Sequence, residues 1–135
     1  MVYRIARRTD LSPNTFLWEV EAPDIARAGK PGQFVMVRMH EGAARIPLTL
    51  ADHDAERGTI TLVVQALGRS TAEMRDQYRV GDAFADVVGP LGIPSEITEV
   101  GHVVLVGGGL GVAPLFPQLR AFKQAGNRTT AIVGF

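Results

Sequence analysis

Apolar and polar side chains alternate along several short stretches of the first hundred residues. The alternation is clearest in the segments 15–21 (TFLWEVE) and 59–65 (TITLVVQ), and the second segment is rich in β-branched residues. A period of two residues is typical of strands that bury one face. Similar stretches predict further strands over residues 2–10, 33–39, 46–51 and 83–88.

Turn and helix signals separate these strands. Ser12-Pro13-Asn14 and Pro31-Gly32 mark turns, and a short helix is predicted to begin near Ser70. Pro47 restricts the strand at 46–51 to a sheet edge or to its first residues, because proline has no amide hydrogen to donate. About six short strands with little helix predict a small antiparallel barrel, which leaves few strand edges exposed.

The pattern changes after Gly101. Residues 102–106 are a continuous apolar run that predicts a parallel strand buried on both faces, and a glycine-rich turn follows it. A helix is predicted over 113–124, and a second apolar strand over 129–134. This strand–helix–strand unit has the size of a nucleotide-binding βαβ motif. We therefore divide the chain into a barrel domain, residues 1–98, and the first part of a nucleotide-binding domain, residues 99–135.

A two-stranded parallel sheet with one covering helix leaves an apolar face open to water. We therefore expect the chain to be the front part of a longer polypeptide, cut inside its second domain after Phe135. The alternative is that another chain covers the sheet, for example a second copy in a homodimer.

Composition excludes several classes of protein. The chain has 14 basic and 14 acidic side chains and no cysteine. Neutrality argues against a nucleic-acid binder, and the lack of thiols excludes disulfides and cysteine-ligated zinc or iron–sulfur centres within this chain. The three histidines have no metal-ligand spacing, so no metal site is expected. Neither a membrane span nor a secretion signal is visible, and we expect a cytoplasmic protein.

The glycine run at 107–111 (GGGLG) is the strongest candidate for binding phosphate. A strand that leads through glycines into a helix directs free amides and the positive end of the helix dipole at one spot. Residues 101–135 also contain three bases and no acid, which suits a phosphate ligand. The spacing is not that of the Rossmann fingerprint, however, and glycines that simply turn a strand into a helix remain the alternative.

Two shorter segments could also contact a phosphorylated ligand. In Arg45–Thr49 (RIPLT), a guanidinium and a hydroxyl flank a short extended piece, and arginine can bind phosphate through two parallel hydrogen bonds. In Gly68–Thr71 (GRST), Ser70 or Thr71 would cap the following helix, and the same amides could bind phosphate. Taken alone, each segment is more often an ordinary edge strand or helix cap.

Together and in this order, these segments resemble the ferredoxin–NADP reductase superfamily. Within it, the electron-transfer subunits of dihydroorotate dehydrogenase and of sulfide dehydrogenase look most similar. The resemblance extends over nearly the whole chain. The residues that carry it are Pro31–Phe34, Arg45–Thr49, Val63–Gln65, Gly68–Thr71, Gly89–Gly92 and Gly107–Pro114.

The resemblance implies a Greek-key FAD-binding barrel followed by an NAD(P)H-binding domain. It implies that Thr49 lies near flavin N5 as the catalytic residue. The implied FAD-binding residues are Arg45, Pro47, Leu48, Thr49, Val63, Val64, Gln65, Gly68, Ser70 and Thr71. The implied residues for the NAD(P)H phosphates and nicotinamide are Gly107, Gly108, Gly109, Gly111, Val112, Ala113 and Pro114.

The chain departs from the family in identifiable places. Many members have the arginine three residues before the hydroxyl residue, whereas Arg45 is four before Thr49, and a shift of one residue turns a strand side chain to the other face. Relatives also carry a C-terminal cysteine cluster for a [2Fe–2S] centre, for which this chain has no ligands.

The resemblance implies an FAD-dependent oxidoreductase subunit that moves electrons between NAD(P)H and an iron–sulfur or flavin partner. That partner would be a glutamate synthase-like or dehydrogenase catalytic subunit. Hydride transfer to flavin needs no side-chain acid or base, so the lack of a catalytic dyad does not argue against an enzyme, although this fragment alone could be inactive. The alternative is a non-catalytic barrel that serves as a scaffold or interaction module without flavin.

Overall fold

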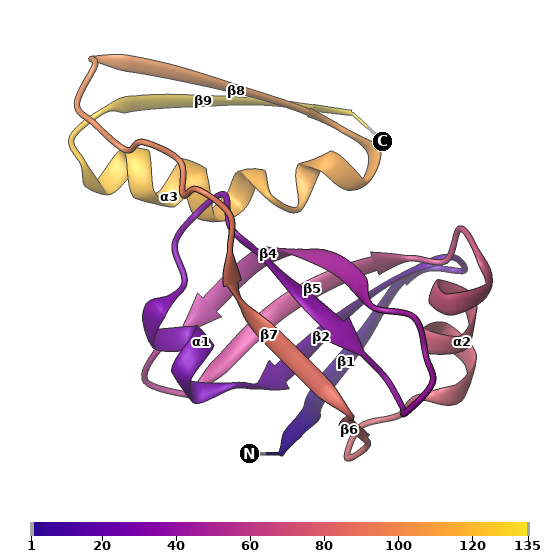
Figure 1. Cartoon of the computed structure of the whole chain (residues 1–135). Coiled ribbons are helices and arrows are strands. Elements are labelled where there is room, and N and C mark those ends of the chain that lie inside the picture. The colour runs from indigo at the N-terminus through magenta and orange to yellow at the C-terminus, as the bar shows by residue number, and fades with distance from the viewer. Residues whose placement is uncertain (1, 135) are drawn as a thin grey trace.

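The computed structural model of the chain describes residues 2–134, which form a barrel and a smaller β–α–β unit beside it (Figure 1). This agrees with the fold class predicted from the sequence. The barrel contains β1 (Tyr3–Ser12), β2 (Thr15–Glu21), α1 (Pro23–Ala28), β3 (Phe34–Arg38), β4 (Ile46–Asp54), β5 (Thr59–Gln65), α2 (Arg69–Gln77), β6 (Ala83–Phe84) and β7 (Asp86–Leu91). The smaller unit contains β8 (His102–Gly108), the 3-10 turn η1 (Gly109–Val112), α3 (Leu115–Gln124) and β9 (Arg128–Gly134).

The barrel is one antiparallel sheet of seven strands in the order β6-β1-β2-β5-β4-β3-β7. Its two edge strands, β6 and β7, follow each other along the chain and are separated only by Ala85. β6 pairs with β1, and β7 pairs with β3, so the sheet curls until it is nearly closed. The single strand predicted over 83–88 is therefore two strands, because the chain changes its pairing partner at Ala85.

Alternation along the strands fills the barrel with apolar side chains. Phe16, Trp18 and Val20 of β2 are buried, and Trp18 pairs across the sheet with the buried Leu62 of β5. The Trp18 ring lies 4.9 Å from the Phe16 ring and 5.3 Å from the Phe84 ring. Each such side chain stabilises the fold by roughly 1.5–3 kcal/mol through burial. Trp18 is completely buried in the barrel core.

Helix α1 is not among the elements predicted from the sequence. Pro23 stands in the first turn of this helix, where a missing amide hydrogen costs nothing. Ile25 and Ala26 turn into the core and are almost completely buried. A helix of six residues is too short for its periodicity to be read from the sequence.

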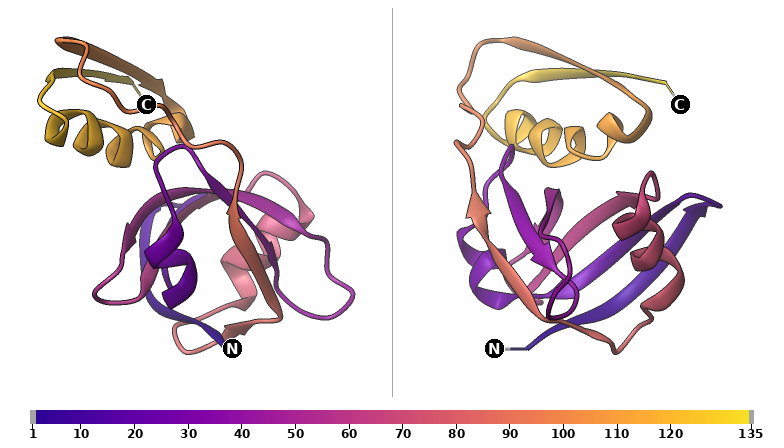
Figure 2. Two further views of the ribbon diagram at one scale, coloured as in Figure 1. Left: turned by 60° about the vertical axis from the view of Figure 1, so that its left-hand side comes forward. Right: turned by 45° about the vertical axis from the view of Figure 1, so that its right-hand side comes forward.

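The β–α–β unit has β8 and β9 paired in parallel, as predicted. The predicted helix over 113–124 begins two residues later, at Leu115, because Gly109–Val112 form the turn η1. Helix α3 lies between the two-stranded sheet and the barrel (Figures 1 and 2). The prediction that the strand at 102–106 is buried on both faces is wrong for this chain: no element among residues 2–134 covers the other face of the sheet, and Val104, Val106 and Ile132 are exposed there.

None of the helices in residues 2–134 is both long and apolar enough to cross a membrane. Within the same range, no three histidine, aspartate or glutamate side chains lie close enough together to hold a metal ion. The boundary predicted between residues 98 and 99 falls in the stretch between β7 and β8.

Candidate functional site

The barrel ladder is incomplete between β4 and β5. Leu50 to Asp54 of β4 pair with Leu62 to Thr59 of β5, with a register shift after Leu50. The preceding residues of β4, from Ile46 to Thr49, pair with β3 only, and Val63 to Gln65 of β5 pair with β2 only. In this part of the described chain, the facing edges of β4 and β5 therefore separate and leave their backbone groups unpaired. Pro47 lies in this one-sided part of the strand, as the sequence predicts.

A cleft of about 710 Å³ lies between the barrel and the β–α–β unit. It is lined mainly by apolar atoms, which suits a flat aromatic ring more than a solvated ion. Its walls are made by Leu11, Ser12, Thr15, Val63 and Gln65 of the barrel and by Gly109, Leu110, Val112 and Ala113 of the other unit. The fold thus places the predicted segments 63–65 and 107–114 on opposite walls of one cleft.

In the predicted segments of β4 and β5, partly or fully exposed side chains alternate with buried ones. Val63 and Gln65 face the cleft, whereas Val64 is 1% exposed and belongs to the barrel core. On β4, Pro47 and Thr49 are exposed, but Leu48 is buried. Strand alternation explains both patterns. Val64 and Leu48 can therefore contact a ligand only through their backbone.

Arg45 lies just before β4 and is engaged within the protein. Its Nη1 donates a hydrogen bond of 2.8 Å to Oδ2 of Asp86 on β7. This bond and the guanidinium charge lower the pKa of Asp86. The ion pair spans β3, which lies between β4 and β7. Any phosphate bound by Arg45 would have to compete with the carboxylate of Asp86.

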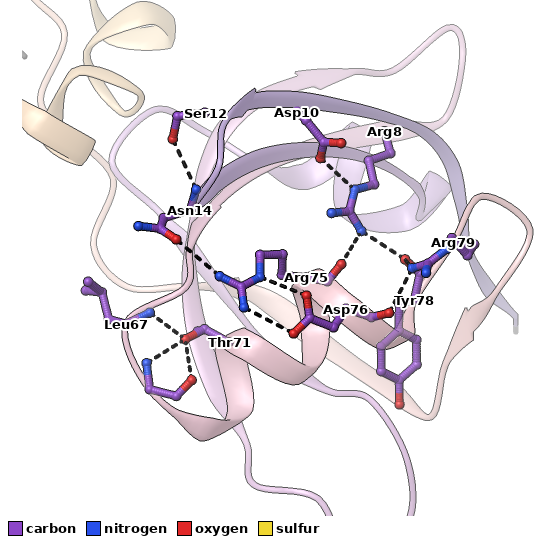
Figure 3. Close-up of polar contacts among 11 residues, drawn as sticks. Arg8, Asp10, Ser12, Asn14, Leu67, Thr71, Arg75, Asp76, Tyr78 and Arg79 are labelled. Carbon is purple, nitrogen blue, oxygen red and sulfur yellow. Dashed lines mark hydrogen bonds and ion pairs between the residues drawn. The ribbon is translucent and has the colours of Figure 1, made fainter.

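The loop before α2 is closed by the Thr71 hydroxyl (Figure 3). Thr71 Oγ1 accepts hydrogen bonds of 3.0 Å from the amides of Leu67 and Gly68, and it donates to the Gly68 carbonyl over 3.3 Å. Thr71 therefore shapes the loop instead of offering a free hydroxyl. The residue that caps the helix is Gly68, whereas the sequence favoured Ser70 or Thr71. The first amides of the helix have no partner within it.

The other end of α2 is tied to the β1–β2 hairpin by two arginines that the sequence analysis did not single out. Arg8 Nη1 donates to the carbonyls of Arg75 and Tyr78, over 2.8 and 3.0 Å (Figure 3). Arg75 Nη1 donates to Asn14 Oδ1 over 3.1 Å. A cation at a helix C-terminus complements the helix dipole. These contacts fix the direction of α2 and hence the position of its N-terminus.

A second hollow, of about 330 Å³, lies at the start of α2. It is bounded by Arg69, Ser70 and Glu73 of the helix and, in the segment after β3, by Met39, His40, Gly42, Ala43 and Ala44. Nε2 of His40, in this segment, lies 2.7 Å from Oε1 of Glu73 across the hollow. Ser70, one of the predicted ligands, lines this hollow, but it does not line the cleft with Val63 and Gln65. The contact between His40 and Glu73 was not predicted, because the two residues are far apart along the chain.

The four glycines of the 107–111 turn differ in their surroundings. A Cβ atom on Gly107 would lie 2.5 Å from Leu115 Cδ1 and 3.2 Å from the carbonyl oxygen of Gly111. A Cβ atom on Gly108, Gly109 or Gly111 would have no neighbour within 4 Å. Gly107 is thus needed for packing against α3. The other three leave an open stretch of backbone beside Pro114, at the start of the helix.

Two contacts hold α3 against the barrel and so fix the width of the cleft. Arg120 Nη2 lies 2.6 Å from Oδ1 of Asp52 at the end of β4. Ser95 Oγ donates to Gln118 Oε1 over 3.0 Å. Neither pair was predicted, because each joins segments that are distant in the sequence.

A nearly closed antiparallel barrel, a parallel β–α–β unit and a glycine-rich turn at the cleft between them define a ferredoxin–NADP reductase-like protein. Over nearly its whole length the chain is similar to members of the ferredoxin–NADP reductase superfamily, as the sequence predicted. Its relatives include electron-transfer subunits of dihydroorotate dehydrogenase B. No family model matches the chain.

Two curated relatives illustrate the similarity. The Thermotoga maritima dihydroorotate dehydrogenase B (NAD(+)) electron transfer subunit homolog is 43% identical over 130 residues, which cover 96% of this chain and 46% of that protein. The corresponding electron transfer subunit of Shouchella clausii is 35% identical over 137 residues, which cover 97% of this chain and 52% of that protein. The chain therefore spans about half the length of the curated relatives it matches.

Solved structures agree with this assignment. The structure of an NADH-dependent reduced ferredoxin-NADP oxidoreductase superposes with a TM-score of 0.95 at 42% identity, and the match covers 99% of this chain and 48% of that one. Phthalate dioxygenase reductase superposes with a TM-score of 0.77 at 19% identity, over 98% of this chain and 42% of that one. The second likeness shows a common fold.

Proposed function

We propose that this chain is the flavin-binding part of an oxidoreductase that transfers electrons between NAD(P)H and a partner subunit. The observation that carries the proposal is the cleft between the barrel and the β–α–β unit. It places Val63 and Gln65, beside the unpaired edge of β4, opposite the glycine-rich turn at Gly109. The named functions of the relatives support the same class of activity.

The residues present fit an FAD molecule. The one-sided pairing of β4 leaves free backbone groups beside the exposed Thr49 and Pro47, where the edge of a heteroaromatic ring could form hydrogen bonds. The hollow at the start of α2 offers unpartnered amides, the Ser70 hydroxyl and the Arg69 guanidinium to a diphosphate. Thr71 and Gly68 would hold the shape of this loop.

The open glycines fit the phosphates of NAD(P)H. Gly108, Gly109 and Gly111 let a phosphate approach the backbone closely, which a Cβ atom would prevent. Val112 and Ala113 would direct the nicotinamide into the cleft. A flavin held there would supply the hydride and single-electron chemistry that the proposed activity needs. The part of this chain is to hold the two rings in contact, to exclude water from the apolar cleft and to place the Thr49 hydroxyl near the flavin edge.

The partner and the setting remain part of the proposal. We propose that a redox partner subunit receives the electrons, and that an iron–sulfur centre, where the complex uses one, lies outside these residues because they contain no cysteine. We further propose a cytoplasmic protein. The exposed face of the β8–β9 sheet would be covered by another part of the complex or by a second copy of the chain.

Flavin uptake by the purified chain tests the proposal. We expect the chain to bind added FAD, to keep its visible absorption through gel filtration and to show a change in that spectrum on addition of NADH or NADPH. Ser70→Glu should abolish FAD retention, since it places an acid at the diphosphate site. Gln77→Glu adds the same charge at the exposed far end of α2 and should retain FAD.

A colourless chain that takes up no FAD would support the alternative function, a scaffold without flavin. Equal loss of FAD in Ser70→Glu and Gln77→Glu would show that the start of α2 is not where the diphosphate lies.

A further inference from the structure

The hollow at the start of α2 contains a titratable pair that the proposed function does not explain. His40 enters it from the loop after β3, while Arg69 and Glu73 enter it from the helix. Nε2 of His40 lies 2.7 Å from Oε1 of Glu73, and its Nδ1 lies 3.0 Å from the backbone carbonyl oxygen of Glu41. The pair therefore links the two walls of the hollow in which we place the FAD diphosphate.

Both ring nitrogens of His40 face atoms that can only accept a hydrogen bond. A carbonyl oxygen and a carboxylate have no proton to donate, so only the doubly protonated imidazolium satisfies both contacts. The hydrogen bond to the Glu41 carbonyl raises the pKa of His40, and the hydrogen bond to Glu73 raises it further. The imidazolium form thus persists to higher pH than in a free histidine.

The charge of this hollow depends on His40. The formal charges of Arg69 and Glu73 are opposite and sum to zero, so the protonation state of His40 decides whether the hollow is positive or neutral. Diphosphate binds more tightly where positive charge and unpartnered amides coincide.

The other ionisable groups around the pair are of types whose ordinary pKa lies away from neutral pH. Glu41 lies on the same loop as His40. Tyr78 and Asp82 border Glu73 on its far side, and the pKa of Tyr78 is raised, by burial first and then by Glu73 and Asp82. Arg45 is paired with Asp86. Near neutral pH, His40 is therefore the group whose charge changes in this surrounding.

We propose that His40 makes FAD binding dependent on pH, by supplying the positive charge that offsets Glu73 at the diphosphate site. This inference rests on the proposed flavin function and adds a residue that sets cofactor affinity. Because protonation favours binding, affinity is highest below the pKa of His40 and falls as pH rises through it. For one charge at a half-exposed site we expect about a fivefold change in the dissociation constant.

Calorimetric titration of FAD into the intact 135-residue chain tests the inference at about pH 6 and about pH 8.5, which bracket the histidine range. In the unmodified chain, FAD should bind about fivefold more weakly at the higher pH. His40→Asn should bind with the weaker constant at both values. The double variant His40→Asn with Glu73→Gln restores a positive hollow, so it should bind tightly at both values.

The double variant separates charge from structure. If His40 served only to tie the loop to α2, removing both partners would not restore binding, and this result would overturn the inference. His102→Asn is the matched control, because His102 lies on β8 and bonds to Thr130, and its pH dependence should equal that of the unmodified chain. FAD bound equally at both pH values would refute the role of His40 and leave the proposed function intact. No FAD binding at either pH would instead refute the proposed function.

Discussion

Gly107 and Gly108 are neighbours in the glycine-rich turn, yet the structure assigns them different roles, and alanine substitution at each position tests this. The methyl group of Gly107→Ala would meet Leu115 Cδ1 at 2.5 Å, Leu115 Cγ at 3.2 Å and the Gly111 carbonyl oxygen at 3.2 Å. The methyl group of Gly108→Ala would meet no atom within 4 Å. Gly108 has φ −128° and ψ 145°, which an alanine adopts without strain.

Crowding in the folded state and restriction of the unfolded chain change the free energy of unfolding in opposite directions. Crowding at Gly107 costs about 1–3 kcal/mol, because Leu115 and the backbone at Gly111 must both move. Replacing glycine by alanine also restricts the unfolded chain, which stabilises by about 0.4–1 kcal/mol. Gly107→Ala should therefore lower the free energy of unfolding by about 1–2 kcal/mol, and Gly108→Ala should raise it slightly. The melting temperatures of the two variants should differ by roughly 5–10 °C.

Thermal unfolding followed by circular dichroism measures the difference, and titration with NADH or NADPH measures the second role. If phosphates approach the open backbone, Gly108→Ala should bind the nucleotide about tenfold more weakly despite its higher stability. Equal melting temperatures for the two variants would refute the packing argument. Unchanged nucleotide affinity in Gly108→Ala would show that the phosphates do not approach this stretch of backbone.

Three further substitutions test the site. Thr49→Val should alter the rate of flavin reduction by NAD(P)H more than the melting temperature, since the two side chains have nearly the same size; equal loss of folding and FAD binding would contradict the proposed role. Arg120→Met removes the ion pair with Asp52, which is partly exposed, so the free energy of unfolding should fall by less than about 1 kcal/mol while nucleotide affinity falls more, as titration would show. Arg45→Met should raise the pKa of Asp86, which carboxyl NMR would show. In the unmodified chain the Arg45–Asp86 contact stabilises the fold above the lowered pKa and is lost as pH falls through it, so the variant should lack this loss of stability. FAD affinity should stay within about twofold in this variant if Arg45 serves Asp86, and a large loss would mean that it binds phosphate.

The barrel was predictable because its strands bury one face and expose the other. In β2 and β5 the predicted and observed bounds are the same, and the two strands pair along their full length from Thr15↔Gln65 to Glu21↔Thr59. The alternation of apolar and polar residues is enough to predict such a strand, because each side chain can point to only one of two faces of the sheet. It was not enough at Ala85, because a change of pairing partner does not alter the alternation of side chains.

The candidate site was predictable only where its chemistry is local. The glycine-rich turn and the loop before α2 each lie within a few consecutive residues, so their residue types could be recognised. The contacts that complete the site join distant positions: His40 and Glu73 are 33 residues apart, and Arg120 and Asp52 are 68 apart. Which distant polar residues meet depends on the packing of whole elements, and no short pattern in the sequence records it.

The position of Pro47 shows how a residue that weakens a strand can mark a site. A proline paired on both sides would remove a hydrogen bond from the ladder, and this weakened the prediction of a strand at 46–51. β4 nevertheless runs from Ile46 to Asp54, because its first half has a strand neighbour on one side only. Exposed strand edges invite pairing with other chains unless something blocks or uses them. Here proline blocks the edge against another strand, while Thr49 and the neighbouring backbone remain free for a ligand, so the same residue that interrupts the sheet keeps the proposed flavin site open.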